Sequence, residues 1–189
     1  AAGTADEIIS ATVGGFYTLV LTLFYKLAAI LRAVELLKGK KLGIDIAVVA
    51  SCQEEVGCRG AVAAAYNVNA DSAIVVEATT AADLHGNDGS KSVCRLGGGA
   101  VVSFMDNGTV YDKQYYNTAL TLDNTQPKTA VAGGNNSSAI HKSRGGVRTL
   151  ALSLPCRYIH SQCSVANVND IFALYNTATK MQSKMHNVA

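Results

Sequence analysis

The feature that most constrains the fold is a run of apolar residues that ends in two adjacent acids and two glycines. Residues Ile44 to Ala50 are apolar apart from Asp45, which predicts a short buried strand. The segment Ser51-Cys-Gln-Glu-Glu-Val-Gly-Cys-Arg-Gly-Ala61 follows, and the alanine-rich stretch 61–66 predicts a helix. Because open α/β sheets bind their ligands at the carboxyl edge of the strands, this pattern places polar groups where a site is expected.

The two acids of this turn, Glu54 and Glu55, are predicted to have different roles. Successive residues of an extended chain point to opposite sides, so the two carboxylates face different surroundings. One acid can then bind a metal ion while the other transfers protons. A Glu-Glu pair by itself is more often two solvated acids on a loop, and its interpretation therefore depends on the rest of the chain.

The segments that follow alternate between strand and helix patterns. Apolar runs predict strands at 72–77, 100–104, 129–132 and 147–154, and periodic segments predict helices at 23–38, 111–122, 139–143 and 169–185. This order predicts an α/β fold with a mostly parallel sheet and helices on both faces, forming one domain over residues 1–189.

Composition argues against nucleic-acid and membrane partners. A net charge of +2, without a cluster of Lys and Arg, is too small for a nucleic-acid surface. The apolar stretch 16–37 contains Lys26 and Arg32, each of which costs about 2.5–3.5 kcal/mol near the centre of a bilayer. The five cysteines are an odd number without a CxxC pair, which favours reduced thiols and a cytoplasmic protein.

Three predicted strands end in side chains that bind zinc or cobalt. These are the Glu54–Glu55 pair, Glu77 and His160. Carboxylates combined with one imidazole favour a hydrolytic divalent-metal site over a thiolate structural site. Glu77 alone is more often a strand-end acid that faces solvent, and His160 alone is equally well explained as a hydrogen-bonded loop histidine.

The triple glycine at 97–99 is not predicted to bind phosphate. No Lys-Ser or Lys-Thr follows it, and the chain contains no GxGxxG sequence. We therefore expect close backbone packing at this point.

Four separated motifs carry a resemblance to a known family. They are Gln53-Glu-Glu-Val-Gly-x-Arg-Gly-Ala61, the strand and loop 73–83, the loop 133–136 and Leu154-Pro-Cys-Arg-Tyr-Ile-His-Ser161. In this order they resemble the dinuclear metallo-aminopeptidases that form tetrahedral particles. This is the glutamyl and deblocking aminopeptidase family, which includes proteins described as endoglucanases. The similarity extends from about residue 45 to residue 170 and matches the C-terminal part of the catalytic domain.

The resemblance implies a function and a role for each predicted site residue. The fold would be a zinc-peptidase-like three-layer domain, and the protein would hydrolyse the N-terminal residue of peptides. Glu54 matches the general base, and Glu55, Glu77 and His160 match ligands of two divalent metal ions, zinc or cobalt. Relatives of this kind imply a homo-oligomer, a dodecamer, that acts on peptide substrates.

The chain also departs from the family pattern. Another metal-binding histidine of the family comes from an earlier segment without a counterpart here, and Phe24-Tyr25-Lys26 stands where a bridging aspartate is expected. Glu77 replaces the usual aspartate, and the dimerisation insert is absent. We therefore expect a catalytic-type domain that is incomplete at its N-terminal end.

These departures leave two alternatives to the aminopeptidase. One is a catalytically impaired relative that serves as an assembly or peptide-binding subunit. The other is a hydrolase that holds a single metal ion and acts on another substrate.

Overall fold

The computed structural model describes residues 27–36, 38–39, 45–84, 86 and 92–185. Its elements in chain order are a helix at 27–36, α3 (Arg59–Val68), β1 (Ser72–Thr80), β2 (Ala100–Val102), α4 (Lys113–Leu120), β3 (Thr125–Pro127), α5 (Ser137–Ile140), β4 (Arg148–Arg157), β5 (Val165–Ala166) and α6 (Val168–Met185). None of the helices within these ranges has the length and apolar character needed to cross a membrane.

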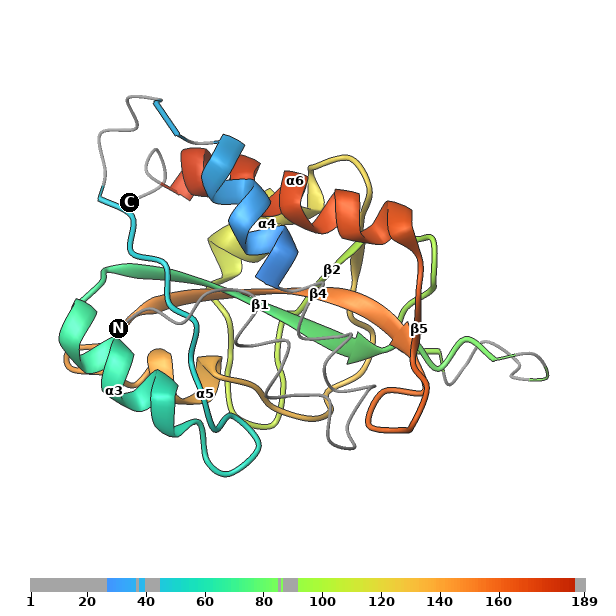
Figure 1. The fold of residues 1–189 in the computed structure, drawn as a ribbon, viewed down its shortest axis with the longest axis horizontal. Helices are drawn as coiled ribbons and strands as arrows, with labels where there is room; N and C mark the ends of the chain where they lie inside the picture. The colour runs from blue at the N-terminus through green and yellow to red at the C-terminus, as the bar shows by residue number, and fades with distance from the viewer. Residues whose placement is uncertain (1–26, 37, 40–44, 85, 87–91, 186–189) are drawn as a thin grey trace, which may run out of the picture.

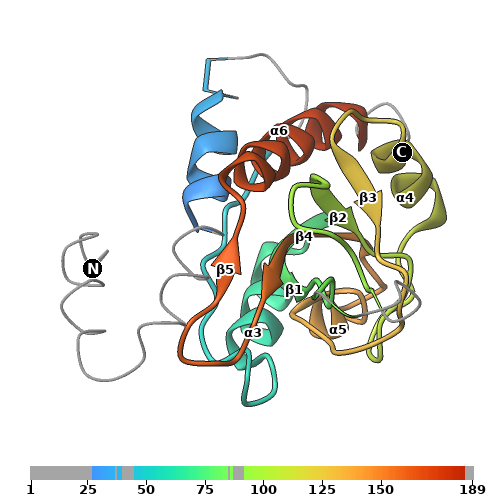
Figure 2. The same ribbon diagram turned by 90° about the vertical axis from the view of Figure 1, so that its right-hand side faces the viewer.

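The strands form a sheet in the order β1-β4-β2-β3, and β5 pairs with the end of β4. Strands β1 and β4 are parallel over nine residue pairs, and β2 and β3 are also parallel. The antiparallel contacts of β4 with β2 and with β5 are only two residue pairs each. Helices α4 and α6 lie on one side of the sheet, and α3 and α5 lie on the other (Figures 1 and 2). The predicted α/β class, with a mostly parallel sheet covered on both faces, is confirmed.

The core is built around β4, which is buried on both faces. Leu150, Leu152 and Leu154 point to one side and are fully buried. They pack against α6, where Leu174 and Met181 are also fully buried. A strand that is covered on both faces has a near-continuous apolar sequence, which is the pattern that predicts β4.

Within the triple glycine, Gly99 packs closely against backbone, as predicted. The amides of Gly97 and Gly99 donate to the two carboxylate oxygens of Asp170, the acid in the first turn of α6, both at 2.8 Å. A Cβ atom on Gly99 would lie 2.0 Å from the carbonyl oxygen of Asn124. Burial raises the pKa of the Asp170 carboxyl group, because the charged form loses its hydration.

The prediction of a strand at 44–50 is wrong for residues 45–50, the part of this segment that the structure describes. Residues 45–50 carry no strand assignment and are all exposed, with Val48 at 48% and Val49 at 43% exposure. An apolar run becomes a buried strand only when a neighbouring strand takes up its hydrogen bonds and other elements cover its faces. In the described part of the chain, the sheet ends at β1 and no strand partners this segment.

The strand predicted at 129–132 is also misplaced. The observed strand, β3, comes earlier, and Val131 is 55% exposed. Within β3, the side chain of Gln126 accepts a hydrogen bond from Arg95 N and donates one to Arg95 O, both at 2.9 Å. A polar side chain that binds the backbone of a distant loop cannot be recognised from apolar periodicity. The predicted residues 23–26, which include Lys26, lie outside the described ranges.

Candidate functional site

The acidic loop between residue 50 and α3 is closed by its own backbone. The carbonyl of Glu54 accepts hydrogen bonds from Gly57 N and Cys58 N at 3.2 and 3.0 Å. Gly60 N donates to Cys52 O at 3.0 Å, and a Cβ atom at position 60 would lie 2.6 Å from the backbone of Cys52. The glycine is therefore required by this close approach. The loop presents Glu55 to solvent, while Glu54 is half-buried.

The predicted histidine lies in the hairpin that joins β4 to β5. Arg157 pairs with Val165 at the base of this hairpin. Tyr158 and His160 both adopt left-handed backbone conformations, with φ of 58° and 61°. Ser161 N donates to Tyr158 O at 3.1 Å, which tightens the turn. His160 is thus held beyond the carboxyl end of the central strand.

Glu55 and His160 meet although they are far apart in the sequence. The distance from His160 Nδ1 to Glu55 Oε1 is 3.8 Å, and both side chains are more than half exposed. The acidic loop and the β4–β5 hairpin therefore bring a carboxylate and an imidazole close together.

Glu77 lies on β1, in register with Ser153 of β4. Its neighbours Val76 and Ala78 pack against the core cluster around α6. Because side chains alternate along a strand, Glu77 points to the opposite face of the sheet, the face on which α3 and α5 lie. Its side chain is half-buried there. Within the described ranges, no three His, Cys, Asp or Glu side chains gather closely enough to hold a metal ion.

The loop 133–136 contacts the acidic loop. Asn136 Nδ2 donates to Ser51 Oγ at 3.0 Å, and Cys58 Sγ lies 3.6 Å from Asn135 O. The side chain of Asn135 donates to the hydroxyl of Tyr111 at 2.9 Å. Burial raises the pKa of Tyr111, so its hydroxyl stays protonated and donates to the carboxylate of Asp106. Two of the sequence motifs are therefore in direct contact.

Sequence reasoning missed the ion pair between Asp83 and Arg157. Arg157 Nε lies 2.7 Å from Asp83 Oδ1, and Arg157 Nη2 lies 3.1 Å from Asp83 Oδ2. The hydrogen bond from Arg157 holds the pKa of the Asp83 carboxyl below its usual value. The sequence signal for this ion pair was positional: Asp83 lies just beyond β1 and Arg157 is the last residue of β4, and these two strands pair in parallel.

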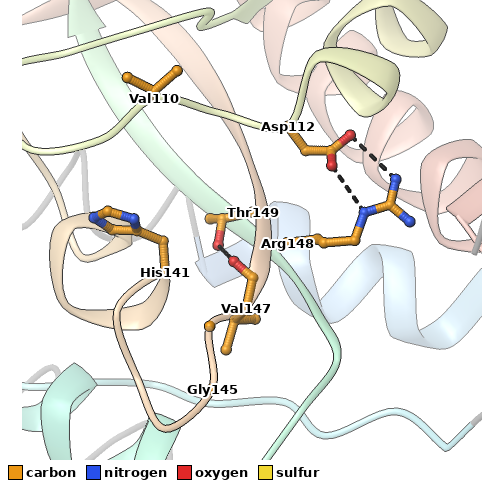
Figure 3. Close-up of a pocket in the computed structure, with 8 residues that line it drawn as sticks. Val110, Asp112, His141, Gly145, Val147, Arg148 and Thr149 are labelled. Atoms are coloured by element: carbon orange, nitrogen blue, oxygen red, sulfur yellow. Dashed lines mark hydrogen bonds and ion pairs between the residues drawn. The ribbon is translucent and has the colours of Figure 1, made fainter.

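A pocket of about 390 Å³ lies at the other end of β4, near its first residue (Figure 3). It is lined by Val110, Asp112, His141, Gly145, Gly146, Val147, Arg148 and Thr149. The ring of His141 is hydrogen-bonded to Gly108 O at 3.0 Å, and Arg148 Nε contacts Asp112 Oδ2 at 2.8 Å. The predicted site residues do not line this pocket.

Fold and geometry together define an α/β domain with a carboxylate–imidazole pair beyond the carboxyl end of its parallel strands. Comparison with known proteins agrees with this class. The model of the M42 glutamyl aminopeptidase family matches residues 25–176. The glutamyl aminopeptidase of Lactococcus lactis subsp. cremoris is 33% identical over 150 residues, which is 77% of this chain and 41% of that protein. The chain belongs to the M42 glutamyl aminopeptidase family.

Solved structures show the same fold. An aminopeptidase from the archaeon Desulfurococcus kamchatkensis superimposes with a TM-score of 0.79 at 27% identity, covering 85% of this chain and 46% of that one. The TET1 peptidase of Pyrococcus horikoshii superimposes with a TM-score of 0.64 at 22% identity, covering 84% of this chain and 47% of that one. The chain thus spans less than half the length of these relatives.

Proposed function

We propose that this chain contributes to the active site of a metal-dependent aminopeptidase, which removes the N-terminal residue of peptides. Membership of the M42 family supports a peptidase, and metal dependence is general in that family. The observation that carries the proposal is the approach of His160 to Glu55. Two distant motifs thereby supply one carboxylate and one imidazole at the same place.

The donor chemistry of this pair would suit a shared divalent metal ion. Zinc binds imidazole nitrogen and carboxylate oxygen at about 2.0–2.2 Å, so two ligands at the tetrahedral angle lie about 3.4 Å apart. The observed separation is 3.8 Å, and both groups are solvent-accessible. A small side-chain movement would bring the two atoms to that spacing. Since the pair is only part of a coordination shell, further donors must complete it.

We assign the remaining roles by combining the resemblance with the observed positions. Glu55, His160 and Glu77 would hold divalent ions, two in the complete site, with zinc or cobalt suited to this donor set. A bound ion of this kind lowers the pKa of a coordinated water towards about 7 and polarises a carbonyl group. Glu54 would accept a proton from the attacking water and deliver it to the leaving amine. Its half-buried position in the closed acidic loop suits a group whose carboxylate must stay in one place.

We also propose that the protein acts as a homo-oligomer. The TET1 peptidase of Pyrococcus horikoshii assembles into a tetrahedron or a large octahedral shell. Exposed apolar side chains, including Val48 and Val49 in the segment before the acidic loop, provide surface that assembly would bury.

The substitution Glu54→Gln tests the catalytic role. It removes the proton acceptor and leaves Glu55 and His160 in place, so we expect Co²⁺ to remain bound. Hydrolysis of leucine or glutamate anilide should fall by about 10²–10⁴-fold, the usual contribution of a general base. Glu35→Gln is a matched control, because Glu35 is an exposed glutamate on the helix at 27–36.

Undiminished turnover in the Glu54→Gln protein would remove Glu54 from this role. A wild-type protein that binds Co²⁺ but hydrolyses neither anilide would instead identify a catalytically impaired relative.

A further inference from the structure

Strand β4 carries an Arg–Asp ion pair at each of its ends. At the first residue, Arg148 Nε lies 2.8 Å from Asp112 Oδ2 (Figure 3). At the last residue, Arg157 Nε lies 2.7 Å from Asp83 Oδ1. The two arginine side chains are almost equally exposed, at 35% and 36%. The pairs are chemically alike, but only the second lies beside the hairpin that carries His160.

The carboxylate of Asp83 joins three segments of the chain. It belongs to the stretch that continues from β1 and binds the guanidinium group of Arg157 through both of its oxygens. It also accepts a hydrogen bond from Leu96 N at 2.9 Å. The side chain of Asp83 is only 12% exposed, whereas that of Arg157 is 36% exposed. Arg157 is therefore fixed to elements other than its own strand.

The hairpin beyond Arg157 needs such an anchor. A non-glycine residue in the left-handed region costs about 1–2 kcal/mol, and this hairpin holds two of them, Tyr158 and His160. Strained conformations of this kind persist only where the surroundings determine them. The antiparallel pairing of Arg157 with Val165 closes the base of the hairpin, and Ser161 Oγ donates to Cys163 O at 3.0 Å within it.

We propose that Asp83 and Arg157 are positioning residues, which hold the β4–β5 hairpin against the end of β1 so that the imidazole of His160 stays opposite Glu55. The part that concerns metal binding rests on the proposed function, whereas the anchoring of the hairpin does not. The planar guanidinium group matters because it binds both carboxylate oxygens at once, which a lysine ammonium group does not reproduce.

The anchoring is tested on the metal-free protein by hydrogen–deuterium exchange with peptide-level mass spectrometry. We expect Asp83→Asn to accelerate exchange in the peptide covering residues 158–165 by about tenfold or more, because local opening becomes easier. Peptides from the core of β4 should be unchanged. Asp112→Asn is the matched control, and it should leave the hairpin peptide as in wild type.

Two outcomes would overturn the anchoring. One is wild-type exchange of residues 158–165 in the Asp83→Asn protein. The other is an equal acceleration throughout that protein, which would show a general loss of stability. Arg157→Lys provides a second variant that keeps the positive charge and the length of β4 but loses the two-point contact.

The role in metal binding is tested by titration with Co²⁺, followed by its visible absorption. Asp83→Asn and Arg157→Lys should each weaken Co²⁺ binding by about 10–100-fold, the usual effect of losing a group that orients a ligand. Asp112→Asn should bind like wild type. Equal affinity in all four proteins would overturn the positioning role. If wild type binds no Co²⁺, the ligand assignment of the proposed function fails, and hydrogen exchange still decides the anchoring.

Discussion

Close approaches of backbone to backbone decide the structure at two single residues. Gly60 lies against Cys52 and closes the acidic loop, and Gly99 lies against Asn124 beside β2. Both positions require glycine, because a Cβ atom would overlap backbone atoms that cannot move aside. The φ of Gly99 is also +90°, a conformation that L-residues with side chains rarely adopt.

Replacing Gly99 by alanine should therefore destabilise the fold by about 3 kcal/mol, from overlap with Asn124 and from backbone strain together. Urea unfolding measures this change. Gly145→Ala is the control, because no heavy atom lies within 4 Å of its Cβ position, and its effect should stay within about 0.5 kcal/mol. Equal stabilities of the two variants would contradict the packing argument.

Strand β4 is held in the fold by burial of its side chains along its length and by ion pairs at its two ends. The leucines of β4 are inaccessible to water. Its first residue, Arg148, and its last, Arg157, form ion pairs with Asp112 and Asp83. Asp112 has a second role as the N-cap of α4, where its carboxylate accepts a hydrogen bond from Tyr115 N at 2.9 Å. The pair with Arg148 thus ties the start of β4 to the start of a helix.

The contribution of this pair to stability should depend on pH. The hydrogen bond from Arg148 lowers the pKa of Asp112 below its ordinary value of 3.8. The stabilisation is therefore present above about pH 4 and is lost as the pH falls through the lower pKa of the folded protein. Asp112→Asn keeps a good N-cap, so it should cost about 1 kcal/mol at pH 7, as expected for a partly exposed pair.

At pH 3 the difference in free energy of unfolding between wild type and Asp112→Asn should be smaller than at pH 7. Guanidinium or urea unfolding at the two pH values measures it. A difference that is independent of pH would show that the charge of Asp112 does not contribute.

On the scale of the whole molecule, the proposed site is assembled from segments spread over the chain. Glu55 precedes α3, Glu77 lies in β1, and His160 follows β4. Parallel pairing of β1 with β4 places the carboxyl ends of both strands at one edge, and the acidic loop reaches the same region. A ligand that binds across these segments stabilises the fold as a whole.

Excess Co²⁺ should therefore raise the melting temperature of the wild-type protein. At a free concentration of about 100 times Kd, the stabilisation is about 2.7 kcal/mol. The shift should be lost in Glu55→Gln and in His160→Gln, and it should be retained in Glu35→Gln. Differential scanning calorimetry measures these changes, and an unaltered shift in either ligand variant would exclude that residue from metal binding.

Much of the fold could be predicted from local patterns. The helix at 169–185 and the strands at 72–77 and 147–154 correspond to α6, β1 and β4. The two strands form as predicted because they pair with each other. The prediction at 44–50 failed because a strand also needs a hydrogen-bonded neighbour. Among the site residues, Glu55 and His160 lie close together, while the ligand roles of Glu55, Glu77 and His160 and the role of Glu54 as general base remain predictions.

Local patterns were sufficient to predict the main elements, the order of four motifs and, through them, the family. Which charged groups meet depends on how the chain folds in three dimensions. The contact between Asp83 and Arg157, like that between Glu55 and His160, depends on the register of β1 on β4 and on how the loops close beyond them. Such contacts join residues far apart in the chain, so no local pattern encodes them.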